Sequence, residues 1–128
     1  ASNILHIASE VLAGEIAAAK NQFDQAILHL DKAVRLDDAL LYTEPPEFHF
    51  PPRLALGAIL LKAGRANEAE TVYWEDLKRI RNNGWALFGL MQALTAQNKT
   101  ERAAIVKERF EQTWQRADRE LKASRFGL

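Results

Sequence analysis

The chain contains no cysteine, and all four of its prolines lie in one short segment. The lack of cysteine excludes disulfides, thiolate metal sites and cysteine nucleophiles. Apolar runs are short and broken by charges, so the sequence predicts no membrane-spanning helix and no membrane partner. No secretory signal is visible, which favours a cytoplasmic protein. Because the chain begins with Ala1 rather than Met, we expect a piece of a longer protein.

No excess of either charge is present, since Lys plus Arg and Asp plus Glu both total 17 among the 128 residues. This balance does not indicate nucleic acid as a partner. The glycines are scattered singly, the three serines lie near the termini, and no two histidines have metal-ligand spacing on a helix. We therefore expect no catalytic, cofactor or metal site, and a protein that is not an enzyme.

Apolar residues recur at spacings of three and four over most of the chain, which predicts amphipathic helices. Pro52 suits a first helical position, and Gly64 suits a left-handed helix end. No strand pattern of alternating apolar and polar residues persists. We expect six helices, at about residues 4–20, 23–40, 52–63, 67–80, 85–97 and 100–124.

Small residues recur at regular intervals along these helices. Gly14 and Ala26 are 12 residues apart, and so are Gly57 and Ala69, while 34 residues separate Ala69 from Ala103. Small side chains let two helices approach closely, and larger residues then fill the space between helix pairs. This periodicity predicts three antiparallel helix pairs that stack in chain order.

The chain resembles the tetratricopeptide repeat (TPR) family in several positions. Trp85, Phe88 and Gly89 match the first helix of the repeat, and Ala69 with Tyr73 matches the second. The proline-rich segment and residues 85–90 together also resemble a C-terminal module of bacterial repeat proteins. The resemblance implies a single all-α domain over residues 1–128, a right-handed superhelix (α-α solenoid) with an elongated C-terminal capping helix. Its parts would be units at about 4–40, 52–82 and 84–115, an insert at 41–51 and a helix extension at 115–124.

In such arrays the first helices line a concave surface that binds proteins or peptides. The lining here would be mostly apolar and lacks the basic clamp for a terminal carboxylate, so we expect a hydrophobic or amphipathic helix, or the protein's own insert, as its occupant. The lining positions that the resemblance implies include Val11, Glu15, Leu54, Ala58, Leu61, Lys62 and Leu90.

The insert combines prolines with aromatic residues and supports two interpretations. It is either a preordered recognition loop that contacts a partner, or a connector that its rings pin to the body of the domain. The residues that would make partner contacts are Tyr42, Glu44, Phe48 and His49.

The last predicted helix is longer than a repeat helix, and its apolar stripe continues past the third unit. It either caps the open face of the last repeat or forms the seam of a weak homodimer. Burial of Trp114 would favour the cap, and exposure an interface. The leading hypothesis is a protein-interaction scaffold. The alternatives are a non-catalytic accessory domain of an upstream enzyme and a homo-oligomerisation module.

Overall fold

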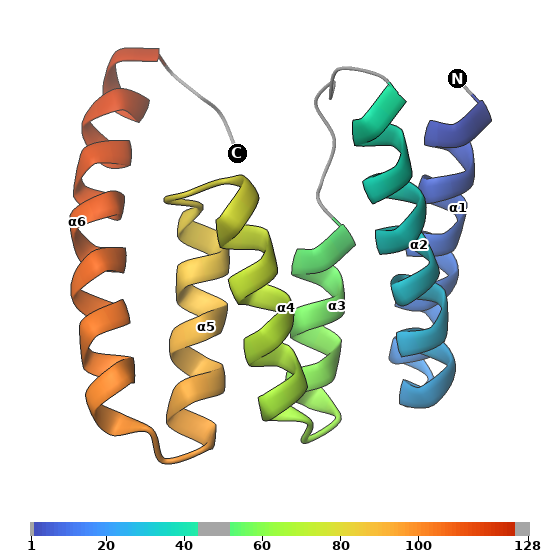
Figure 1. Ribbon diagram of the computed structural model, residues 1–128, viewed down its shortest axis with the longest axis horizontal. Coiled ribbons are helices and arrows are strands. Elements are labelled where there is room, and N and C mark those ends of the chain that lie inside the picture. The colour runs from blue at the N-terminus through green and yellow to red at the C-terminus, as the bar shows by residue number, and fades with distance from the viewer. Residues whose placement is uncertain (1, 44–51, 125–128) are drawn as a thin grey trace.

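The computed structural model describes residues 2–43 and 52–124, and side chains within 4–39 and 52–116. These residues form helices and no strand, so the predicted all-α fold is confirmed, and each helix lies close to its predicted range. Successive helices lie side by side in chain order (Figure 1). The helices are α1 (Ser2–Ala19), α2 (Phe23–Thr43), α3 (Pro52–Lys62), α4 (Ala66–Arg79), α5 (Gly84–Ala96) and α6 (Thr100–Ser124).

Three turns of the same geometry join α1 to α2, α3 to α4 and α5 to α6. Each contains one residue with positive φ: Asn21 (59°), Gly64 (78°) and Asn98 (61°). In every turn this residue's amide donates to the carbonyl three residues earlier, and the next amide donates to the carbonyl five residues earlier. This pair of bonds satisfies carbonyls that the helix end leaves open. The predicted left-handed end at Gly64 is confirmed, and the chain repeats it twice with asparagine.

The helices contact one another in an uneven pattern. Each helix packs against the next in the chain, and α3 also contacts both α1 and α5. In contrast, the backbones of α2, α4 and α6 do not approach one another closely within the described ranges, and side chains such as Arg79 and Asp38 bridge the gap between α4 and α2. The first helices of the three pairs therefore meet along one side of the stack, while the second helices stay apart on the other.

Glycines permit the close approach of helices at the centre of this stack. A Cβ atom on Gly14 would lie 2.7 Å from Cγ of Leu30. A Cβ on Gly57 would lie 2.7 Å from Cε1 of Tyr73, and one on Gly89 would lie 2.6 Å from the Tyr73 hydroxyl. The ring of Tyr73 is thus wedged between α3 and α5. Tyr73 thus fills the space between the second and third pairs, as the sequence predicts for a larger residue, whereas Leu30 packs against Gly14 within the first pair.

A partly buried ionic cluster joins α2, α3 and α4. Arg53 donates two hydrogen bonds to the Asp38 carboxylate, at 2.7 and 2.8 Å, and Arg79 pairs with the same group at 2.8 Å. Nearby, Asn83 donates to the buried Asp76 at 2.8 Å. Burial raises the pKa of Asp76 despite that hydrogen bond and the two arginines. The cluster fixes how the first pair sits against the second.

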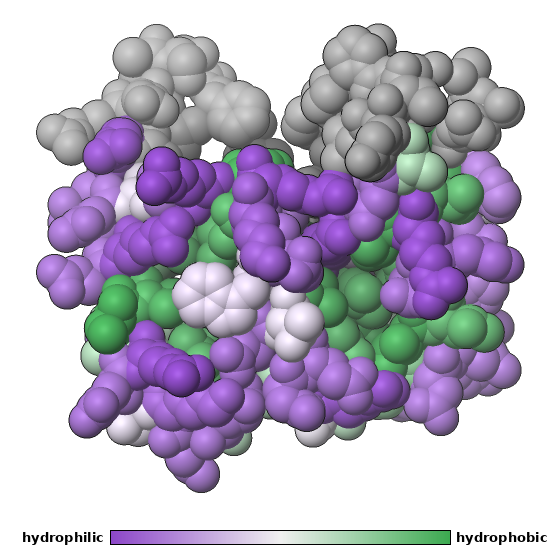
Figure 2. Space-filling model, viewed as in Figure 1, coloured by the Kyte–Doolittle hydropathy of each residue, from purple (hydrophilic) through white to green (hydrophobic). Residues whose placement is uncertain are grey.

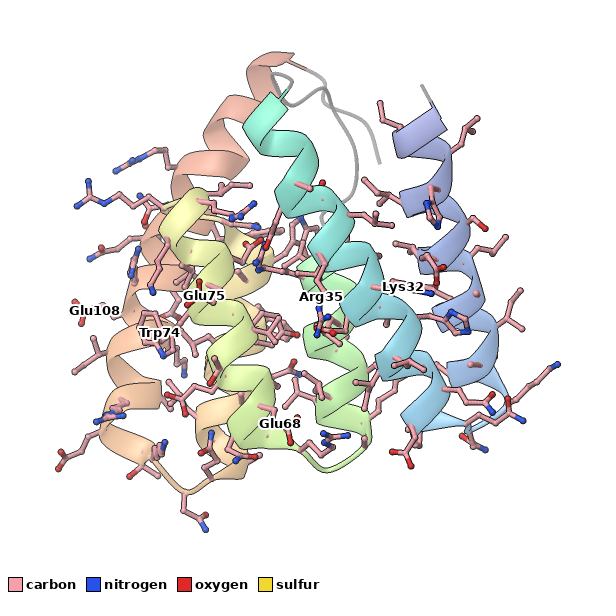
Figure 3. The ribbon with its side chains drawn as sticks, turned by 45° about the vertical axis from the view of Figure 1, so that its right-hand side comes forward. Lys32, Arg35, Glu68, Trp74, Glu75 and Glu108 are labelled. Atoms are coloured by element: carbon pink, nitrogen blue, oxygen red, sulfur yellow. The ribbon has the colours of Figure 1, made fainter. Side chains whose placement is uncertain are left out.

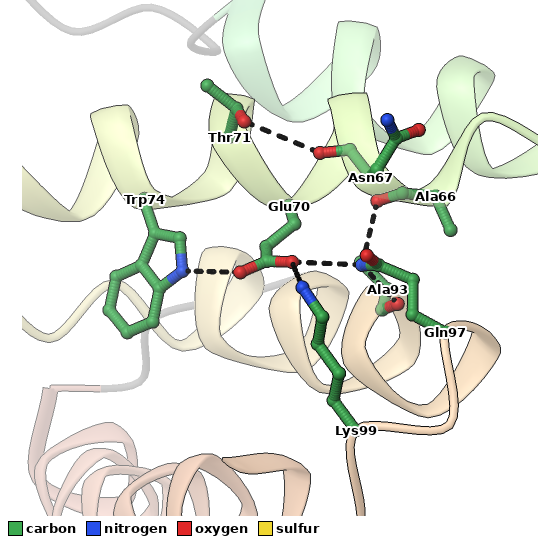
Figure 4. A network of polar contacts seen from close by, with 8 residues as sticks. All are labelled: Ala66, Asn67, Glu70, Thr71, Trp74, Ala93, Gln97 and Lys99. Atoms are coloured by element: carbon green, nitrogen blue, oxygen red, sulfur yellow. Dashed lines mark hydrogen bonds and ion pairs between the residues drawn. The ribbon is translucent and has the colours of Figure 1, made fainter.

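A second polar network joins α4 to α5 and to the turn that precedes α6 (Figure 4). Glu70 accepts hydrogen bonds from Gln97 and Lys99, both at 2.9 Å, and from the Trp74 indole at 3.2 Å. Burial opposes ionisation of the Glu70 carboxyl, but these donors outweigh it and lower its pKa. Trp74 is therefore held by its own helix.

The outward faces of α2 and α4 carry charged side chains, including Lys32, Arg35, Glu68 and Glu75 (Figure 3). Arg35, Glu68 and Glu75 form ion pairs with residues one turn away, such as Arg35 with Asp31 at 3.0 Å, and Lys32 pairs with Glu10 of α1 at 3.9 Å. Exposed pairs of this kind contribute little to stability. This face is therefore an ordinary solvated surface.

Candidate functional site

Four aromatic residues of α5 and α6 form a partly exposed cluster. Trp85 and Trp114 meet edge to face with ring centroids 5.9 Å apart, Phe110 stacks on Trp114 at 5.8 Å, and Phe88 contacts Phe110 at 5.6 Å. Trp85 keeps 56%, Trp114 45% and Phe88 41% of its surface exposed. Aromatic pairs of this geometry stabilise each other. The rings of the cluster therefore support one another while large parts of their apolar surface stay exposed to solvent.

A pocket of about 340 Å³ opens beside this cluster, between α3 and α5. Its surface is mostly apolar, and the lining residues with a polar group in the side chain are Tyr73, Trp85 and Gln92. Such a space suits one or two apolar side chains of a partner. The residues that line it are Leu54, Ala58, Tyr73, Trp85, Phe88, Gly89 and Gln92.

Tyr73 gives this pocket a polar point within an apolar wall. Its side chain is almost fully buried, and burial, with the nearby Asp76 as a second cause, raises the pKa of Tyr73 to about 12. The hydroxyl therefore stays protonated at physiological pH and can donate a hydrogen bond.

A second hollow of about 630 Å³ neighbours the first, and Gln92 lines both. It lies between α5 and α6, and Lys107 stands on its wall. We call the two hollows together the α5 groove. Lys107 forms no ion pair with another described residue, and the same holds for Lys62, which is exposed one turn after Ala58 on α3. The groove thus combines aromatic surface with basic groups that no described acid neutralises.

The structure places the expected lining residues in different environments. Leu54 and Ala58 line the pocket, and Lys62 follows them on the same face of α3. Leu90, in contrast, is fully buried, since its side of α5 packs into the core, so it offers no surface to a partner.

The remaining expected positions lie outside the α5 groove. Val11 and Leu61 are half-buried and pack against the core, and Glu15 is exposed on α1. Tyr42 belongs to α2, but its side chain is outside the described part of the structure, as are residues 44–51 with Glu44, Phe48 and His49.

Trp114 combines the packing expected of a capping residue with the exposure expected of an interface residue. It stacks on Phe110 and covers the side of Trp85, as a capping residue would, yet it stays partly exposed. Trp85 and Phe88 were matched to the repeat pattern in the sequence, and no contact with a partner was assigned to them. The spacing of Lys107, Phe110 and Trp114 along one stripe of α6 was the available signal for a continuous surface.

A scan against protein-family models and searches of curated proteins and solved structures found no match for this chain. Within the described residues, no group of three or more histidine, aspartate or glutamate side chains is arranged to hold a metal ion. None of the described helices is both long and apolar enough to cross a membrane. The site must therefore be interpreted from its own geometry.

Proposed function

We propose that this chain is a TPR-like interaction module that binds a segment of another protein in the α5 groove. The exposed aromatic cluster of Trp85, Phe88 and Trp114 beside an apolar pocket carries the proposal. Monomeric proteins seldom leave several large rings together in water, and such surfaces are typical of binding sites. Tryptophan is also among the residues that contribute most to protein interfaces.

The repeated turns support a TPR-like superhelix. Asn21 and Gly64 are separated by as many residues as Gly14 and Gly57. The backbone of α3 approaches both α1 and α5, whereas the backbones of the second helices do not approach one another, and this difference favours curvature that brings the first helices to the inner side. The α5 groove then lies near the end of that inner surface.

The chemistry of the groove indicates what the bound segment carries. An aromatic or aliphatic side chain fills the pocket beside Phe88, and Gln92 and the Tyr73 hydroxyl offer hydrogen bonds to its polar atoms. Lys62 and Lys107 favour acidic residues next to that anchor. The proposed ligand is an apolar anchor flanked by acidic residues.

The test selects ligands from a displayed library of random peptides and measures their dissociation constants by fluorescence anisotropy. Phe88→Ala and Trp85→Ala should weaken binding by about 10-fold or more, as expected for residues at the centre of an interface. Trp74→Ala is the matched control, because it removes an exposed tryptophan of α4 that lies outside the groove. Peptides that bind both groove variants as tightly as the wild type would contradict the proposal.

A further inference from the structure

The outward face of α1 presents a stripe of apolar side chains. Leu5, Leu12 and Ile16 are exposed, the first two by 71% and 61%, and Ala8 and Ala19 continue the stripe at helical spacing. Figure 2 shows hydrophobic surface at the edge of the molecule formed by α1 and α2. An uncovered apolar face of this kind normally marks a contact surface.

The equivalent positions of the other first helices are covered. Leu12 lies two residues before Gly14, just as Ala55 lies two before Gly57 and Leu87 two before Gly89. Ala55 is only 6% exposed and Leu87 is fully buried. From the preceding pair, α2 packs most extensively on α3, and α4 packs most extensively on α5. The face of α1 is therefore equivalent to faces that are covered elsewhere in the stack, and no described helix covers it.

The opposite end of the stack does not offer a partner for this face. The side of α2 that packs toward α3 carries Ile27 and Val34, which follow Ala26 by one and eight residues. Counted in the same way from Ala103, α6 carries Ala104 and the exposed Glu111. Docking α6 of another copy onto α1 would bury this acid against leucine and isoleucine, which is costly. A head-to-tail chain of copies is thus disfavoured.

The stripe on α1 is instead complementary to itself. When a second α1 runs antiparallel and the two copies cross at Leu12, each Leu5 lies opposite Ala19 of the other copy, and each Ile16 lies opposite Ala8. Large side chains then meet small ones on both sides of the two-fold axis, which is the interdigitation that close helix packing needs. The stripe contains no charged residue, so two copies do not repel each other there.

We propose that a second copy of this chain covers α1, in a symmetric dimer built on an antiparallel α1 pair. A two-fold interface needs only one self-complementary surface, and this stripe supplies it. One helix pair buries less area than a stable dimer usually has, so the dimer forms with a dissociation constant in the micromolar range or weaker.

Sedimentation equilibrium over about 10 μM to 1 mM tests the dimer. The wild type should approach twice the monomer mass at the upper end, and Leu12→Glu should raise the dissociation constant by about 10-fold or more, since it buries a charge at the two-fold axis. Leu28→Glu is the matched control: this leucine of α2 is 69% exposed but lies outside the stripe. Circular dichroism verifies that both variants fold. A monomer at every concentration, or equal weakening by both variants, would overturn the proposal.

Cysteine cross-linking tests the geometry, because the chain has no cysteine of its own. Under oxidised glutathione, Leu12→Cys should yield a disulfide-linked dimer, and a mixture of Leu5→Cys with Ala19→Cys should yield the mixed dimer. Neither variant of that mixture should link to itself, because its positions lie far from the two-fold axis. Self-linking of Leu5→Cys in preference to the mixed product would show parallel pairing and refute the antiparallel arrangement.

Discussion

Replacement of Gly89 by alanine tests the packing on which the α5 groove rests. In an ordinary helix this change stabilises a protein by about 1 kcal/mol, because glycine is the more flexible residue. Here the new Cβ would lie 2.6 Å from the Tyr73 hydroxyl and 2.5 Å from its Cε1. Carbon contacts are normally about 3.5–4.0 Å, so the ring must move by roughly 1 Å.

Tyr73 has no room for that movement. Retreat from Gly89 drives the ring toward Gly57, where a glycine is also required by the close approach of the ring. Overpacking of a tight core costs about 1–3 kcal/mol, which outweighs the helical gain. We expect Gly89→Ala to destabilise the protein by about 1–2 kcal/mol, a drop of roughly 0.5–1 M in the urea midpoint.

Urea unfolding followed by circular dichroism measures this effect, with two reference variants. Gly84→Ala places its Cβ 3.6 Å from Trp114, an ordinary contact, and should leave the midpoint unchanged or higher. In a Tyr73→Val background the ring is gone, and Gly89→Ala should then become stabilising. A higher midpoint for Gly89→Ala in the wild-type background would refute the wedge.

Polar and aromatic contacts elsewhere in the stack give three further predictions. Hydrogen bonds lower the pKa of Glu70 below its usual 4.5, so the ionised carboxylate stabilises the fold above pH 4.5, and this stabilisation is lost as the pH falls through the lowered pKa. In Glu70→Gln the urea midpoint should therefore depend less on pH across this acidic range. Phe110→Ala should cost about 2 kcal/mol and shift the tryptophan emission to longer wavelength, because Trp114 loses its stacking partner. Arg53→Ala should lower the free energy of unfolding by about 1–3 kcal/mol, since two hydrogen bonds to a partly buried carboxylate are lost, whereas Arg35→Ala at an exposed pair should change it by less than about 0.5 kcal/mol.

The sequence predicts the helices well, because apolar periodicity, Pro52 and Gly64 act locally. It also predicts the positions of closest approach, since only small residues fit where Leu30 and Tyr73 cross the neighbouring helix. The repeated turns at Asn21 and Asn98 were less evident, because glycine is the usual residue at a left-handed helix end and asparagine is common in other conformations too.

The exposed surfaces were harder to predict. Periodicity identifies the apolar face of a helix but does not show which neighbour covers it. The match of Trp85 and Phe88 to the repeat pattern therefore does not show that α6 covers them only in part. Leu90 was expected to line the groove because of its position in the repeat pattern, but its side of α5 packs into the core, and Met91 and Gln92 line the second hollow instead. Which face of a helix remains open is decided by the stack as a whole.

The most direct test of the α5 groove uses the three tryptophans of the chain, each of which gives one indole N–H signal in a ¹H–¹⁵N spectrum. Titration with a selected peptide should shift the signals of Trp85 and Trp114, which flank the groove, and leave Trp74 in place, since its indole is bonded to Glu70 on another face. A shift of the Trp74 signal with Trp85 and Trp114 unmoved would contradict the account.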